Sequence, residues 1–274
     1  MKVTSYAQGK WIEKGTETEL HSAVDGKPVA TLVESDLDYG AMCHHARTAG
    51  GPALRELTIH QRAFRIKFLA QHLMEHKEEF YALSTHTGAT RRDSWIDIEG
   101  GIGSMFTLSS KARIELSDLP FHVEGGMERL SRGGTFIGQH ICVPKHGVAV
   151  HINAFNFPVW GMLEKFAPAF IAGVPSIVKP SPLGSYLAHA VFKKMIESEL
   201  LPEGSIQFIA ANVPGDLLDH LGSQDSVSFT GSAFTGRKLK AHPNIIANSI
   251  PFNLEADSLN CSILGPDVTP DMEE

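Results

Sequence analysis

Two amide side chains follow an apolar run in the stretch HINAFNFPVWG, residues 151–161. The run GVAVHI is typical of a buried strand, and Asn153 and Asn156 come where a core would place aliphatic residues. An amide N–H can donate to an oxygen that gains negative charge during a reaction. An asparagine can equally hold a turn by bonding its own backbone. The stretch therefore predicts a polar strand end and leaves the role of each amide open.

A second candidate is FTGSAFTG, residues 229–236, which runs from an apolar strand through a glycine into a helix. Gly231 would let a ligand approach the backbone, and Ser232 at the helix N-terminus would favour a phosphate. The same residues fit a glycine turn with a serine N-cap that binds no ligand. The spacing is not the G-x-G-x-x-G of dinucleotide-binding loops. The sequence therefore favours neither the phosphate site nor the ligand-free serine cap.

Two charged residues also follow apolar pieces. Lys179 comes directly after PSIV, where its ammonium could donate to ribose hydroxyls or a phosphate. A solvated lysine in an extended proline loop is the alternative. Glu255 lies in IPFNLEADSLN, and a half-buried carboxylate there could act as a general base. A strand-end acid paired with a lysine is the alternative. Taken singly, none of these motifs decides the function.

These residues can act together only if a sheet brings the ends of their strands close to one another. Residues 147–250 have the sequence pattern of such a sheet. Short apolar runs alternate there with amphipathic stretches. We expect strands at 147–152, 175–178, 205–210 and 225–230, and helices at 158–173, 183–200, 215–222 and 232–242. This pattern predicts an open, parallel, doubly wound α/β sheet of Rossmann-like type. Ligands bind such sheets at the carboxyl ends of the strands, where the candidate residues fall.

The first half of the chain does not show this regular alternation of strands and helices. Residues 6–34 carry short strand-like pieces. Helices are predicted at 60–88, where Gly88 is a stop signal, and at 93–116, where EGGIG loosens the helix. The stretch VEGGMERLSRGG, residues 123–134, is predicted to be a turn-rich linker to the β-like TFIGQHICV.

Composition limits the partners. The 274 residues, 42% hydrophobic and 20% charged, are typical of a globular protein with one large domain or two small ones. The formal net charge of -7 gives no electrostatic reason to expect nucleic acid or a membrane as partner. Cys43, Cys142 and Cys261 lack metal-ligand spacing, so we expect neither disulfides nor a metal site. With no apolar leader or spanning run, we expect a cytoplasmic protein.

Taken in order, the motifs resemble those of the aldehyde dehydrogenase family. NAFNFP matches the family's N-F-P turn, VKPSP its lysine-proline turn, FTGSAFTG its phosphate-contacting segment and NLEADSLN its L-E segment. The resemblance implies that Asn156 is the oxyanion donor and Glu255 the general base, and it leaves Asn153 as a turn residue. It also implies cofactor contacts at Ile152, Lys179, Ser181, Pro182, Gly215, Phe229, Thr230, Gly231, Ser232 and Gly236.

The resemblance extends to domain organisation. It implies a cofactor-binding domain over residues 1–258, with core segments 20–125 and 147–258, a β oligomerisation arm from 4–18 and 126–146, and the start of a catalytic domain at 259–274. A homo-oligomer is the expected assembly of the whole protein.

The family's nucleophile is a cysteine a few dozen residues past the glutamate. This chain ends at Glu274, 19 residues past Glu255. We therefore expect the nucleophile and the rest of the catalytic domain to lie outside this chain, as for a fragment of a longer protein, and the chain alone to be inactive. Cys261 sits in an apolar, strand-like run without a neighbouring base, so we expect an inert core cysteine there.

The resemblance also bears on substrate and cofactor. GVAVHINAFNFPVWGMLEKFAP is most similar to bacterial members that oxidise a CoA-linked semialdehyde in phenylacetate degradation, with benzoyl-CoA pathway members as the alternative. Many NAD-preferring relatives place a glutamate three residues after the lysine, where it binds the adenosine ribose. Pro182 stands there, so a 2′-phosphate meets no like charge and can pair with Lys179. We expect NADP in preference to NAD. A non-catalytic nucleotide-binding module is the alternative function.

Overall fold

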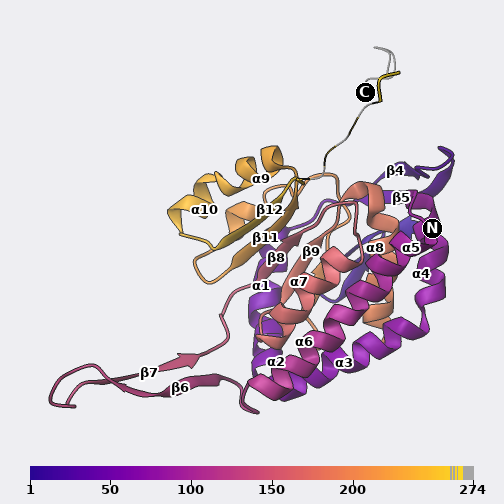
Figure 1. Ribbon diagram of the computed structural model, residues 1–274. Helices are drawn as coiled ribbons and strands as arrows, with labels where there is room; N and C mark the ends of the chain where they lie inside the picture. Colours follow the sequence, from indigo (N-terminus) through magenta and orange to yellow (C-terminus); the bar gives the residue numbers. More distant parts are fainter. Residues whose placement is uncertain (260, 262, 264, 268–274) are drawn as a thin grey trace.

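The computed structural model describes residues 1–259, 261, 263 and 265–267, and a seven-stranded sheet forms its centre (Figure 1). The strand order is β12-β11-β8-β9-β10-β2-β3. The strands are β2 Ser5–Ala7, β3 Lys10–Ile12, β8 Ala149–Ile152, β9 Ser176–Lys179, β10 Ile206–Phe208, β11 Ser226–Gly231 and β12 Phe252–Ala256. The five from β12 to β10 are parallel, and β2 and β3 are antiparallel additions. The predicted open α/β sheet is confirmed.

Helices cover both faces of this sheet. On one face lie α7 (Trp160–Ile171) and α8 (Ser185–Glu197), with α3 (Ile59–Glu75) and α6 (Gly101–Glu115) packed outside them (Figure 1). On the other lie α1 (Tyr39–His45), α9 (Ala233–Lys240), α10 (Pro243–Ala247) and a 3-10 turn, Leu217–His220. Each face has its own apolar core, which is the burial that a doubly wound sheet requires. No helix in the described part of the chain combines the length and apolar character of a membrane span.

The first half of the chain adds a small sheet and a helical layer. The sheet has the order β1-β5-β4, with β1 Lys2–Val3, β4 Thr16–His21 and β5 Pro28–Glu34. The shorter helices are α2 (Gly51–Arg55), α4 (Lys77–Ser84) and α5 (Arg91–Trp95), with π-helical turns at Ala46–Gly50 and Ile96–Gly100. Both predicted helices are present, but the first breaks at His76 and the second changes to a π-helical turn beside EGGIG. Gly88 ends the first with a φ of 85°.

A separate hairpin extends away from the body (Figure 1). It pairs β6 (His122–Arg129) with β7 (Ile137–Cys142). The predicted turn-rich linker is therefore wrong over most of its length, because the glycine pair is absorbed as an irregularity between Glu124 and Glu128 instead of ending the strand. Residues 5–12, expected in the arm, belong to the main sheet through β2 and β3. That the hairpin serves oligomerisation stays a prediction.

Candidate active site

The carboxyl ends of four parallel strands meet at one edge of the main sheet. Ile152, the last residue of β8, pairs with Lys179 of β9 and Phe229 of β11. Thr230 of β11 pairs with Glu255 of β12. The strand order reverses at β8, since the later strands β9 and β11 lie on opposite sides of it. A cavity of about 610 Å³ lies at this switch point, where doubly wound sheets bind their ligands.

Most of the predicted site residues line this cavity. They are Asn156, Lys179, Ser181, Pro182, Phe229, Thr230, Gly231, Ser232 and Glu255. Three others do not. Ile152 is buried in the core, and Gly215 lies beside Tyr39, whose ring a Cβ would meet at 2.5 Å. Gly236 is buried where α9 packs on the sheet, and a Cβ there would meet Leu254 Cδ1 at 2.2 Å.

Lys179 is the cation of the cavity, and it is only 4% exposed. Its Nζ donates to the backbone oxygens of Pro180 and Asn212, each at 3.1 Å. These bonds leave one ammonium proton for a ligand. Burial lowers the pKa of Lys179 to about 8, and the Glu34 carboxylate acts in the opposite direction. A solvated lysine, one of the two interpretations of the sequence, is excluded.

The FTGSAFTG segment forms the N-terminus of α9 at the cavity wall. The Ser232 hydroxyl caps the helix by accepting from the Thr235 N–H at 3.2 Å. The Ala233 N–H donates to Asp257 Oδ1 at 2.8 Å. The predicted serine cap is therefore present and lines the cavity. A phosphate bound at this helix end would compete with the Asp257 carboxylate for the Ala233 N–H.

Asn156 and Glu255 also line a second cavity of about 320 Å³, which shares Ala154 and Thr230 with the first. Its other lining residues are Ile96, Phe157, Trp160, Gly161 and Glu164. The Thr230 hydroxyl donates to Glu255 Oε2 at 3.0 Å. An amide donor and a carboxylate thus border one small, largely apolar space beside the larger cavity. A small carbonyl compound held there could meet a hydrogen-bond donor and a base.

Two of the expected side-chain environments are wrong. Asn153 was expected to bond its own backbone, but its amide is buried without a partner among the described residues. Its backbone N–H donates to the Lys179 oxygen at 3.0 Å, so the residue continues the strand ladder and makes no turn. Glu255 is exposed, not half-buried, because β12 is the outer strand of the sheet.

The cysteines lie apart from these cavities. Cys43 is buried in α1, and burial raises the pKa of its thiol to about 11. Cys142 is exposed in β7. Cys261 is exposed as well, so the expected core position is wrong. The chain leaves the sheet after Ala256, and Leu259 and Ile263 are also exposed, since no described element packs on this run.

One buried acid beside the site was missed in the sequence. Asp97, 5% exposed, accepts from the backbone N–H groups of Val159 at 3.1 Å and Trp160 at 2.8 Å. Burial raises its pKa to about 7, against the lowering effect of these two bonds. The spacing of Asp97, Gly101 and Met105 places the acid on the buried stripe of its helix, and that pattern could have revealed it.

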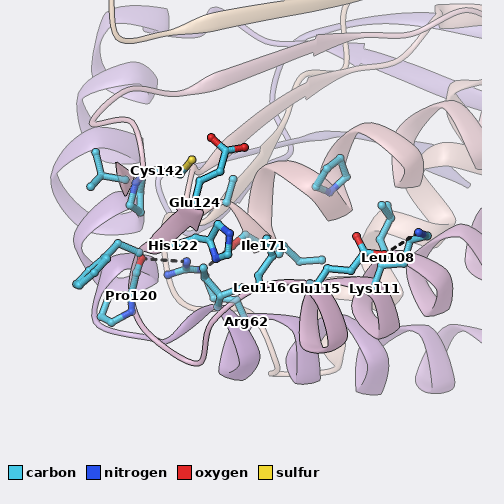
Figure 2. A pocket seen from close by; sticks show the side chains of 17 residues that line it. Arg62, Leu108, Lys111, Glu115, Leu116, Pro120, His122, Glu124, Cys142 and Ile171 are labelled. Atoms are coloured by element: carbon cyan, nitrogen blue, oxygen red, sulfur yellow. Dashed lines mark hydrogen bonds and ion pairs between the residues drawn. The ribbon is translucent and has the colours of Figure 1, made fainter. Parts of the chain in front are cut away.

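A further cavity, of about 520 Å³, lies near the base of the hairpin (Figure 2). Arg62 reaches it from α3 and is 1% exposed. Its guanidinium donates to the backbone oxygens of Leu54, Leu57 and Ile171 at 2.9, 2.6 and 2.7 Å. Because Leu54 and Ile171 lie in the last turns of α2 and α7, the charge faces the negative ends of two helix dipoles. None of the predicted site residues lines this cavity.

Comparison with known proteins identifies the family of the chain. The profile of the aldehyde dehydrogenase family matches residues 11–273. The chain belongs to the aldehyde dehydrogenase family. It is 41% identical over 278 residues to the 3,4-dehydroadipyl-CoA semialdehyde dehydrogenase of Aromatoleum evansii, a match that covers 100% of this chain and 53% of that protein. It is 28% identical over 250 residues to the N-succinylglutamate 5-semialdehyde dehydrogenase of Serratia proteamaculans, covering 88% and 48%. The chain spans about half the length of the curated relatives it matches.

Solved structures show the same aldehyde dehydrogenase fold. The NADP-dependent glyceraldehyde-3-phosphate dehydrogenase of Bacillus halodurans, complexed with NADP, matches with a TM-score of 0.80 and 22% identity over 93% of this chain and 53% of that one. A point mutant of betaine aldehyde dehydrogenase from Staphylococcus aureus, in complex with NAD+, matches with a TM-score of 0.78 and 24% identity over 93% and 50%. At these identities the likeness shows the fold alone.

Proposed function

We propose that this chain is the cofactor-binding part of an NADP-dependent dehydrogenase that oxidises a CoA-linked semialdehyde to the carboxylic acid. One observation carries the proposal: Asn156 and Glu255 border a single 320 Å³ cavity that adjoins the 610 Å³ cavity at the switch point. A nucleotide-binding module would need the larger cavity, but it has no use for an amide and a carboxylate facing one small space.

The larger cavity suits a nicotinamide dinucleotide. Lys179 offers a buried ammonium proton that no described group accepts, and Ser232 stands at a helix N-terminus on the same wall. Lys179 would hold the adenosine ribose, and the uncharged Pro182 beside it favours a 2′-phosphate, hence NADP over NAD. When bound, the nicotinamide accepts a hydride from the substrate.

The chain's own residues then have distinct roles. The Asn156 amide donates to the aldehyde oxygen as that oxygen gains negative charge, and loss of such a donor typically costs about 3 kcal/mol in the transition state. Glu255, held by Thr230, takes the proton of the water that releases the acid. The nucleophilic cysteine of the family is proposed to lie in the part of the protein outside this chain.

The substrate class follows from the small cavity together with one relative. Ile96, Phe157 and Trp160 make much of its wall apolar. Of its two acids, Glu164 pairs with Lys165 at 3.2 Å, whereas Glu255 forms no ion pair with a described lysine or arginine and keeps its negative charge. An aldehyde with a second free carboxylate would be repelled there, whereas a thioester is uncharged. The relative with 41% identity is named for a CoA-linked semialdehyde. We propose the same class of substrate here, with the semialdehyde of phenylacetate degradation and 3,4-dehydroadipyl-CoA semialdehyde as the two candidates.

The test uses the whole product of the gene that carries this chain. NADPH formation is followed with each CoA-linked semialdehyde and with a free semialdehyde acid, and again with NAD in place of NADP. We expect the CoA-linked compounds and NADP to be preferred. Asn156→Ala should lower kcat by roughly 100-fold, whereas Asn248→Ala, which alters an exposed amide after α10, should leave it unchanged. NADP binding without oxidation of any aldehyde would establish the binding module instead.

A further inference from the structure

The EGGIG stretch belongs to the π-helical turn Ile96–Gly100 and the start of α6, and this segment packs closely on the beginning of α7. A Cβ at Gly100 would lie 2.4 Å from Trp160 Cζ3, and one at Gly101 would lie 2.8 Å from Trp160 Cα. At Gly101 the neighbour is backbone, so a side chain there would push the two helices apart, whereas a side chain at Gly100 would displace the Trp160 ring. The pair therefore brings the π-helical turn against the residue that begins α7.

This approach delivers the Asp97 carboxylate to the N-terminus of α7. It accepts from the N–H groups of Val159 at 3.1 Å and Trp160 at 2.8 Å, and Val159 provides no side-chain cap of its own. The first N–H groups of a helix have no partner within the helix, so an acceptor from elsewhere fixes the point where the helix begins. Here that point follows directly on the NFP turn that carries Asn156.

The position of Asn156 depends on its backbone. Among the described residues its side chain has no hydrogen-bond partner, and it is exposed. Asp97 and Asn156 line one cavity of about 530 Å³, while Ile96 and Asn156 line the 320 Å³ cavity. The π-helical turn thus borders the NFP turn at both cavities. The Asp97 carboxylate holds the backbone N–H groups of Val159 and Trp160, which directly follow the NFP turn.

We propose that Asp97 is a positioning residue for the reaction: by holding the Val159 and Trp160 N–H groups, it keeps the Asn156 amide where the aldehyde oxygen gains charge. The inference rests on the proposed role of Asn156. A misplacement of a reacting group by about 1 Å can cost roughly 100-fold in rate, so a tie three residues away is enough to matter.

The first experiment is a double-mutant cycle in the whole gene product, with Asp97→Ala, Asn156→Ala and both together. We expect Asp97→Ala to lower kcat by roughly 10- to 100-fold, with the KM for the aldehyde within about twofold of the original. In the Asn156→Ala background, Asp97→Ala should have no further effect. Asp97→Asn keeps an Oδ1 acceptor for both N–H groups and should retain most of the original kcat. Asp219→Ala, which alters an exposed acid of the 3-10 turn Leu217–His220, should keep the original kcat.

The outcomes separate the two ideas. Equal losses from Asp97→Ala in both backgrounds, or an unchanged kcat in Asp97→Ala alone, would overturn the inference and leave the proposed function standing. An unchanged kcat in Asn156→Ala would remove the role of Asn156 and this inference with it.

A second readout on this chain needs no catalysis. Hydrogen exchange of Asp97→Ala should speed up at the amides of Phe157 and of residues 159–162 by about tenfold or more, while α3 keeps its original rates. Faster exchange throughout the chain would show a general loss of stability and would overturn the positioning role.

Discussion

The Thr230 hydroxyl donates to the Glu255 carboxylate at 3.0 Å, between register partners of the adjacent strands β11 and β12. Parallel pairing brings together two residues that lie 25 positions apart in the sequence. Glu255 is exposed on the edge strand, and no described lysine or arginine forms an ion pair with it. The threonine is therefore the side chain that directs this carboxylate.

Replacement of Thr230 by valine keeps the shape of the side chain and removes its hydroxyl. We expect kcat of the whole gene product to fall roughly fivefold, which corresponds to about 1 kcal/mol for one hydrogen bond to an exposed carboxylate. Thr230→Ser retains the hydroxyl and should keep most of the activity. The role assigned to this bond fails if the serine and valine variants are equally slow.

Lys179 should make NADPH binding depend on pH. Burial lowers its pKa to about 8, so the ammonium charge is present below that pH and is lost as the pH rises through it. We expect the affinity of this chain for NADPH, measured by fluorescence titration, to fall roughly tenfold between about pH 7 and pH 9, and the affinity for NADH to fall less. Lys179→Met should abolish the difference, whereas exposed Lys193→Met should not. A wild-type curve that is flat over this range would contradict the pairing of Lys179 with the 2′-phosphate.

The main sheet and the strand-end site could be predicted because their signal is local. Runs such as GVAVHI and PSIV are short, apolar and followed by polar residues, and parallel pairing brings such ends together. The hairpin strand β6 was missed because its glycine pair resembles a turn, and only pairing with β7 makes it a strand.

Long-range contacts set the limit of the sequence analysis. Lys179 is buried because its ammonium meets the Asn212 oxygen, 33 residues later in the chain. Asp97 accepts from residues 62 and 63 positions later, Val159 and Trp160. The donors are backbone N–H groups, so the side chains at these positions give no sign of the bonds. The hydrogen-bond partners of these two residues depend on how elements pack, so motif and periodicity alone do not reveal those partners.

Gly50 and Gly103 form a matched pair for a stability test. Both lie in helical segments, but a Cβ at Gly50 would come within 2.0 Å of the backbone oxygen of Gly204, whereas nothing lies within 4 Å of one at Gly103. Gly50→Ala should lower the free energy of unfolding by about 1–3 kcal/mol, because backbone cannot move aside cheaply. Gly103→Ala should raise it by about 0.5–1 kcal/mol through helix propensity. Urea unfolding of the two variants checks both signs, and equal midpoints would contradict this packing.

His189 should destabilise the chain in acid. Burial lowers its pKa to about 4, while an unfolded histidine has a pKa near 6.5. Between these values the unfolded chain binds a proton that the folded chain does not, so the free energy of unfolding falls as the pH falls, by up to about 3 kcal/mol from this residue. His189→Phe, which preserves ring packing against Trp11 and Phe208, should lose less stability than the original chain between about pH 7 and pH 5. The same change at exposed His44 is the control, and an identical acid loss in both variants would refute the assignment.

The chain by itself should bind NADPH without oxidising aldehydes. Its cavity at the strand ends has the buried ammonium and the helix N-terminus that a dinucleotide needs. Its cysteines are not placed for attack there: Cys43 is buried with a pKa raised to about 11, and Cys142 and Cys261 line none of the three described cavities that contain Asn156. Purified chain mixed with NADP and a CoA-linked semialdehyde should therefore give no rise in NADPH absorbance, while a fluorescence titration shows binding. A steady rise would mean that one of these thiols reaches the substrate, and alanine replacement of each in turn would identify it.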